Sequence, residues 1–429
     1  MAPARQIAAT ILSGLVVVGL GACGSSPPSA CLTPDTEPRE LASHNATDPV
    51  VATGATGSAV AAWSSLTGTP VSVRVRDAGL QWGSVHTIGD YRTRNPDVAM
   101  ASDGQPWVAF EGFDDDRAAV FAASGPDWTP DLISRGQANA QEPQIAVAGE
   151  GTVIAAWITF VNGTQGAIAV SVHGPDGWSA PAMVASATSR VEHLSLSAAT
   201  DGSAVLAWTG GGGRAWATAR QPNGRWSPAA TVSSGDREAI EPAVAAGSAG
   251  EGWVVWNEAK RDGTAARVVI RRFRAGSWDA PTTLDTASQG PLQMPRPGQA
   301  LLGPALAMTH DGALTATWAV GSRRRSQVRA RTFTPRRGWA PTVTLSDPAD
   351  HAGAPAVAIG PEGRPIVAWE EVDHNLLRTR SRTLGGGERC TDLIGAVTES
   401  SAIALAGGTH PVAVFIDLRR ASVDVQDLR

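Results

Sequence analysis

Short apolar runs and short alternating runs, separated by turn residues, follow one another along almost the whole chain. Ile366–Trp369 (Ile-Val-Ala-Trp) is a typical apolar run, and Val71–Arg76 (Val-Ser-Val-Arg-Val-Arg) is a typical alternating run. A period of two residues indicates a β-strand with one buried face, and runs this short do not form amphipathic helices. Pairs such as Asp103-Gly104 and Asp311-Gly312 stand between runs. They favour tight hairpins, because the chain must adopt positive φ there. The pattern predicts an all-β protein.

One aromatic residue recurs at the end of each apolar run. The eight landmark aromatics are Trp63, Phe110, Trp157, Trp208, Trp256, Trp318, Trp369 and Phe415. Consecutive landmarks are 46 to 62 residues apart. A period near this length without a helical pattern is typical of propeller blades, each a four-stranded antiparallel sheet. We therefore predict an eight-bladed β-propeller, with seven blades as the alternative. The recurrent tryptophans are interpreted as packing residues between blades.

The two ends of the chain predict how the ring closes. After Phe415 there is one more alternating stretch, Val423–Val425, and no fourth strand follows it. Residues 31–41 begin with Cys-Leu-Thr-Pro, which resembles the Trp-x-x-Pro phrase that opens fourth strands such as Trp278–Pro281. We expect this N-terminal strand to complete the eighth blade, which would remove a free sheet edge.

The first residues predict export and a lipid anchor. Arg5 precedes an apolar run, Ile7–Ala22, which ends in Leu-Gly-Ala before Cys23. This segment is short for a membrane span and resembles the lipobox of bacterial lipoprotein signal peptides. The resemblance implies a signal peptide at 1–22, a lipid on Cys23, and attachment to the outer face of the cell membrane, or a periplasmic position in a host with an outer membrane. Residues 23–30 would be a flexible tether, and 31–429 the propeller domain.

Two cysteines remain in the propeller, and the charge balance narrows the partners. Cys31 and Cys390 stand at the same fourth-strand position of neighbouring blades, and an exported pair is normally oxidised, so we predict a Cys31–Cys390 disulfide. A formal net charge of −5 argues against a nucleic-acid partner. The chain has no phosphate-binding glycine loop and no His-Glu-x-x-His or Cys-x-x-Cys motif. We therefore expect no cofactor and no metal.

The candidate binding site lies in the loops that join one blade to the next. In a propeller these loops reach the mouth of the central channel. Just before the first strand of successive blades stand Asp48, Asn95, Glu142, His193 and Glu241. Slightly earlier come Arg92, Arg94, Arg135, Arg190 and Arg237. The loops between second and third strands add carboxylates, among them Glu111, Asp116, Glu258 and Glu371. The planar guanidinium fork suits a carboxylate, sulfate or phosphate. Ordinary solvation of loop residues is the alternative interpretation.

The blade rhythm over residues 31–429 resembles the sialidase-like propellers of secreted bacterial proteins. The resemblance implies an arginine triad for a sugar carboxylate, a tyrosine nucleophile and an aspartate acid/base. The single tyrosine, Tyr91, lies between Asp90 and Arg92 and is the candidate nucleophile. The Asp-box spacing is not matched by Ala101–Trp107, and the Arg-Ile-Pro signature is absent. We therefore predict an envelope-anchored propeller that binds a glycan, another anionic ligand or a protein. A sialidase-like glycoside hydrolase and an interaction scaffold are the alternatives.

Overall fold

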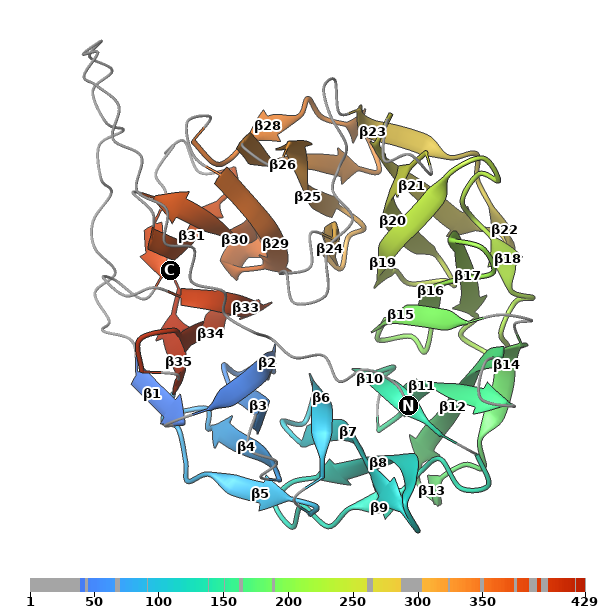
Figure 1. Cartoon of the computed structure of the whole chain (residues 1–429), viewed down its shortest axis with the longest axis vertical. Helices are drawn as coiled ribbons and strands as arrows, with labels where there is room; N and C mark the ends of the chain where they lie inside the picture. The colour runs from blue at the N-terminus through green and yellow to red at the C-terminus, as the bar shows by residue number, and fades with distance from the viewer. Residues whose placement is uncertain are drawn as a thin grey trace.

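The strands form a closed ring of eight sheets. The computed structural model describes residues 39–428 apart from 43–44, 66–69, 91, 138, 150, 162–164, 187–189, 261–264, 287–302, 323–324, 348–350, 374–375, 386–391, 395–399 and 421. Regular structure in these residues consists of 35 strands and one short 3-10 helix. The strands build eight separate sheets of four or five strands, arranged around a central axis (Figure 1). The eight-bladed propeller is confirmed. No helix in the described residues has the length and apolar character needed to cross a membrane.

Each blade is a continuous stretch of chain except the last. Blade one contains β2 (Ala46–Thr53), β3 (Ala59–Ser65), β4 (Val71–Arg76) and β5 (His86–Ile88). Blade two contains β6 (Arg94–Met100), β7 (Pro106–Asp114), β8 (Arg117–Ser124) and β9 (Asp131–Leu132). Blade three contains β10 (Gln141–Val147), β11 (Val153–Val161), β12 (Gln165–Gly174), β13 (Gly177–Trp178) and β14 (Ala182–Ser186). Blades four and five contain β15 (Val191–Ala198), β16 (Ala204–Gly210), β17 (Arg214–Arg220) and β18 (Ala230–Thr231); and β19 (Glu238–Ala246), β20 (Gly252–Ala259), β21 (Arg267–Arg274), β22 (Ser277–Trp278) and β23 (Thr282–Thr286).

The remaining blades follow the same order from the axis outward. Blades six and seven contain β24 (Ala305–Met308), β25 (Leu314–Ser322), β26 (Arg325–Thr334), β27 (Gly338–Trp339) and β28 (Val343–Thr344); and β29 (His351–Ile359), β30 (Pro365–Asp373), β31 (Leu376–Thr383) and β32 (Asp392–Ile394), with the 3-10 turn η1 (Pro361–Gly363) between β29 and β30. Blade eight contains β33 (Ser400–Ala406), β34 (Val412–Asp417) and β35 (Ser422–Asp427), completed by β1 (Arg39–Ala42).

The N-terminal strand closes the ring, as predicted. β1 pairs antiparallel with β35, and Arg39 lies opposite Val425. A buried arginine ties the same joint from the neighbouring blade: Arg76 donates to the carbonyl oxygen of His410 at 2.9 Å and pairs with Asp427. Cys23, Cys31 and Cys390 lie outside the described residues, so the lipid and the disulfide remain predictions.

The core lies between adjacent blades and explains the landmark aromatics. Trp157, Trp256, Trp318 and Trp369 are all fully buried. One core cluster joins Val205 and Ala217 of blade four to Trp256 of blade five. Each landmark therefore fills the space between sheets. Small residues such as alanine fit where the inner strands approach the axis.

The arginines of the third strands have a structural role. Arg271 donates Nε to the carbonyl oxygen of Asp279 at 2.7 Å, and Arg331 donates Nε to that of Ala340 at 2.6 Å. These carbonyls follow the tryptophan of the fourth strand. Proline then interrupts the fourth strand in blades three, five and six, between two short segments that pair with the third strand. The interruption of the fourth strand leaves backbone carbonyl groups without a partner in the sheet. The arginine side chains of the third strand donate hydrogen bonds to these carbonyls.

Candidate functional site

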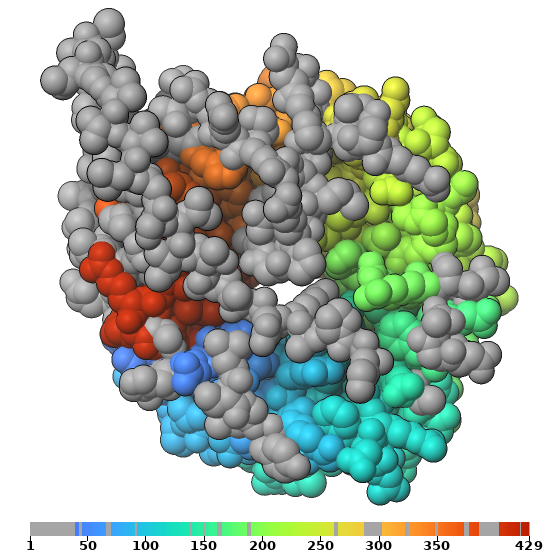
Figure 2. Space-filling model, viewed as in Figure 1, coloured from blue at the N-terminus to red at the C-terminus, as the bar shows by residue number. Residues whose placement is uncertain are grey.

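The loops between blades and those between second and third strands share one face of the ring. In blade one, Ala46 at the start of the first strand lies opposite Ser65 at the end of the second. The same antiparallel register recurs in the other blades, so the predicted site residues border one mouth of the channel. A narrow opening is visible at the centre of the ring (Figure 2).

The first strand of six blades begins with the same β-bulge, and the bulge places the predicted polar residues. Its first residue has φ between 46° and 56° in each case: Asp48, Asn95, Glu142, His193, Glu241 and Ala354. The register of the inner strand shifts at each of these points. A positive φ is uncommon outside glycine, and bulges redirect side chains near functional sites. The bulge thus brings five predicted residues to equivalent positions around the mouth.

A hydrogen-bonded network joins blades two, three and four at the mouth. Glu111, whose side chain is 3% exposed, accepts Nε of Arg94 at 2.7 Å. It also accepts Nδ2 of Asn95 at 2.8 Å and the backbone N–H of Glu142 at 2.7 Å. Glu142 in turn accepts the backbone N–H of His193 at 3.2 Å. Four of the predicted site residues are therefore linked through one buried carboxylate, which we call the Glu111 network (Arg94, Asn95, Glu111, Glu142 and His193).

The other predicted arginines have separate partners. Arg92 pairs with Asp116 at 2.9 Å, and its guanidinium lies 4.4 Å from the ring centre of Phe113. Arg190 pairs with Glu192 of its own strand at 2.5 Å. Within the described residues, these contacts do not bring the five arginines into a single cleft. Arg94 is the one that joins the Glu111 network.

Arg135 and Arg237 likewise contact residues of their own blades. Arg135 donates Nε to the carbonyl oxygen of Leu132 at 3.0 Å. Arg237 donates to the carbonyl oxygen of Ala265, and its Nε lies 4.0 Å from Glu258. Asp48 and Glu241 occupy the bulge positions of blades one and five, and Glu241 is buried. Tyr91 lies outside the described residues, so its role stays a prediction.

Three carboxylates expected in loops, Glu111, Glu258 and Glu371, belong instead to the second strands β7, β20 and β30. Glu258 and Glu371 are almost fully buried, two residues beyond the landmark tryptophan. Glu371 accepts the indole Nε1 of Trp369 at 3.1 Å and Nε of Arg380 at 2.6 Å. Glu258 is bound in the same way in blade five. Glu258 and Glu371 hold the core and do not face a ligand, and the Trp-x-Glu spacing is the sequence signal that would have identified them.

An aspartate on the inner strand of blade two was not anticipated from the sequence. Asp97 accepts the backbone N–H of Ile145 in blade three at 2.8 Å. Burial raises the pKa of Asp97 to about 6. The group therefore titrates close to neutral pH, two residues beyond Asn95 of the network.

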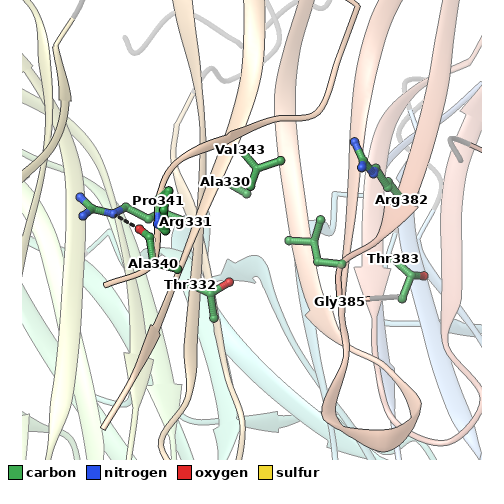
Figure 3. A pocket seen from close by; sticks show the side chains of 10 residues that line it. Ala330, Arg331, Thr332, Ala340, Pro341, Val343, Arg382, Thr383 and Gly385 are labelled. Carbon is green, nitrogen blue, oxygen red and sulfur yellow. Dashed lines mark hydrogen bonds between the residues drawn. The ribbon is translucent and has the colours of Figure 1, made fainter. Parts of the chain in front are cut away.

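Two hollows lie away from the mouth, between the outer strands of neighbouring blades. One, of about 240 Å³, is lined by Ala330, Val343 and Thr383 together with Arg382, while Arg331 points away from it to Ala340 (Figure 3). The other, of about 230 Å³, lies between blades five and six. Among the described residues, no group of three or more His, Cys, Asp or Glu side chains is placed to hold a metal ion.

Solved propellers share this architecture at low sequence identity. No protein-family model matches the chain, and no curated protein sequence matches it. The structure of a PL25 polysaccharide lyase, an ulvan lyase bound to -[GlcA(1-4)Rha3S]-, is 8% identical, with 80% of this chain and 97% of that chain covered and a TM-score of 0.52. A second structure of a PL25 ulvan lyase gives 8% identity, the same coverage and a TM-score of 0.51. The likeness is one of fold.

A sialidase structure fits less closely. A variant of the NanB sialidase of Streptococcus pneumoniae is 10% identical, with 83% of this chain and 69% of that chain covered and a TM-score of 0.42.

Proposed function

We propose that this chain is an exported, lipid-anchored propeller that binds an anionic glycan at the mouth formed by the Glu111 network. The observation that carries the proposal is the way the Arg94 side chain is held at the mouth. Its Nε is fixed by the buried carboxylate of Glu111, while its side chain is 50% exposed at the rim of the channel. In the part of the chain that the structure describes, no acceptor is recorded for its two terminal nitrogens. A guanidinium held in this way is ready to donate paired hydrogen bonds to a carboxylate or sulfate.

Neighbouring groups supply the polar contacts that sugar hydroxyls need. Asn95, Glu142 and His193 stand at successive bulges, and each is tied to the network by its backbone or side chain. Their positions are therefore fixed by the bulge geometry, which limits the ordering that a ligand would have to impose. This arrangement supports a site in which Arg94 binds the anionic group of the ligand. The polar residues towards blade four would bind the sugar hydroxyls.

The anchor is proposed from the sequence. The lipobox-like Leu-Gly-Ala before Cys23 supports lipidation, and β1 begins at Arg39, so the tether would join the propeller at the outer edge of blade eight. A lipid on Cys23 would keep the mouth site at the membrane surface, where envelope glycans are concentrated.

A titration of the propeller with defined oligosaccharides tests the site. We expect an oligogalacturonate hexamer to bind at least tenfold more tightly than neutral maltohexaose in isothermal titration calorimetry. Arg94→Ala should weaken the binding of the uronate at least tenfold. Arg364→Ala is the matched control, because Arg364 is also half exposed and paired with a carboxylate, Glu362, but lies at the opposite face.

Two results would argue against the proposal. Equal affinity for the charged and neutral oligosaccharides would remove the anionic specificity, and unchanged uronate affinity in Arg94→Ala would remove the site. Cleavage of the oligosaccharide during the titration, detected as new reducing ends, would instead support the glycoside hydrolase hypothesis.

A further inference from the structure

The groove between blades five and six combines aromatic rings with arginine side chains. Trp253 of β20 packs against Phe333 of β26, with ring centres 5.0 Å apart. It also meets Trp339 of β27 edge-on at 5.9 Å. These rings line the hollow of about 230 Å³, on the face opposite to the mouth. The aromatic cluster thus forms one wall of an open groove.

The same aromatic cluster recurs between blades two and three, which separates packing from binding. There Trp107 packs against His173 at 4.6 Å and Trp178 at 5.8 Å. The cross-strand partner of Trp107 is Ser124, whereas the partner of Trp253 is Arg272. Since the rings are present at both joints, they serve blade packing. The charged residues distinguish the joint between blades five and six.

The guanidinium of Arg272 already fills the space between the aromatic rings. Its Cζ lies 5.2 Å from the ring centre of Trp253 and 5.7 Å from that of Phe333. A ligand cation is therefore excluded, because the protein supplies its own. Its Nη2 pairs with Glu251 at 2.5 Å, and its Nε is buried without an acceptor among the described residues. Because this Nε is buried, a ligand oxygen could meet Arg272 only at the 19% of its side chain that is exposed.

Further charged groups extend the groove towards solvent. Arg274, with a side chain 55% exposed, pairs with Asp279 at 3.0 Å. The charged residues that line the groove are two guanidinium groups, Arg272 and Arg274, and one carboxylate, Asp279, in a chain whose net charge is −5. The groove therefore favours a ligand that has hydroxyls, an apolar ring face and a negative charge.

We propose that the groove lined by Trp253, Arg272, Arg274 and Trp339 is a second binding site, for an acidic saccharide unit. The pyranose face would contact the exposed part of Trp339, and a carboxylate or sulfate would meet Arg272 and Arg274. The proposal does not depend on the mouth site, because the two share no residue and lie on opposite faces.

Binding stoichiometry separates the two sites. Equilibrium dialysis of the mature chain with a labelled galacturonate disaccharide should give two bound molecules per chain, and one in Arg272→Met/Arg274→Ala. Methionine keeps the packing between the rings while removing the charge. Arg94→Ala should also leave one bound molecule, that of the groove. If only the groove binds and the mouth does not, the wild type binds one molecule per chain. Arg94→Ala then still binds this molecule, and Arg272→Met/Arg274→Ala does not.

A pair of tryptophan variants provides the matched control. Trp339→Leu should lower the affinity at the groove at least tenfold, while Trp178→Leu at the equivalent joint should leave it unchanged. If the double arginine variant binds as many molecules as the wild type with the same affinity, the groove is not a binding site. If both tryptophan variants fail to fold, Arg274→Ala alone decides, since the side chain of Arg274 is 55% exposed.

Discussion

The carboxylate of Glu258 accepts the indole Nε1 of Trp256 at 2.7 Å, two residues back along the same strand. The same carboxylate accepts Nε of Arg267 from the next strand at 2.5 Å. Blade seven repeats this arrangement with Trp369, Glu371 and Arg380 (that is, the same spacing in sequence). The landmark tryptophan is thus held by a buried charge as well as by packing. The acidic residues near the mouth accordingly divide into structural and exposed groups.

Removing the carboxylate of Glu258 should destabilise the propeller strongly. Glu258→Ala leaves Arg267, whose side chain is 31% exposed, and the fully buried indole of Trp256 without their shared acceptor. Loss of one partner of a buried pair costs about 3–5 kcal/mol. Urea unfolding should show this loss, while Glu362→Ala, at a side chain 72% exposed, should change the midpoint little. Equal effects of the two changes would contradict the structural role of Glu258.

Asp97 should make stability fall as the pH rises towards neutral. Its folded pKa of about 6 lies above the ordinary value of 3.8, so the folded state holds the proton more tightly than the unfolded chain. The favourable contribution is complete below about pH 4 and is lost between about pH 4 and 6. Asp97→Asn keeps an acceptor for Ile145 and removes the cost of ionisation. It should raise the free energy of unfolding by about 3 kcal/mol at pH 8, with no gain at pH 4. A gain of the same size at both pH values would refute this assignment.

Arg76 should control the opening of the ring. Its side chain is fully buried, contacts Gly57 within blade one, and joins blade one to His410 and Asp427 of blade eight. Arg76→Ala should lower the stability by about 3 kcal/mol, because the acceptors around it lose their donor. Amide hydrogen exchange should rise first in β1 and β35. Uniformly faster amide exchange in all eight blades would contradict this role of Arg76 in closing the ring.

Most of the fold was predictable because the signals are local and repeat. The landmark aromatic recurs once per blade, and the Asp-Gly turns and the Trp-x-x-Pro phrase recur in several blades, so the copies reinforce one another. The ring closure followed from a missing fourth strand after Val423–Val425, and β1 fills that place. Strand ends were less predictable. β20 continues past Trp256 to Ala259, because its last residues still pair with β19 and β21.

The site was only partly predictable because its contacts cross between blades. The bulge positions of Asn95, Glu142 and His193 followed from the repeat, and the structure places them as neighbours around the mouth. Which arginine meets which carboxylate depends on loops of adjacent blades, and no local pattern encodes it. The groove around Arg272 was missed for the same reason, since its rings come from two different blades.

The measurement that tests the central claim most directly is amide hydrogen exchange of the mature chain with and without saturating oligogalacturonate. The account predicts slower exchange at residues 92–97, 141–145 and 191–195, where the Glu111 network borders the mouth, and loss of this protection in Arg94→Ala. Protection that leaves these three segments unchanged would contradict a glycan site at the mouth.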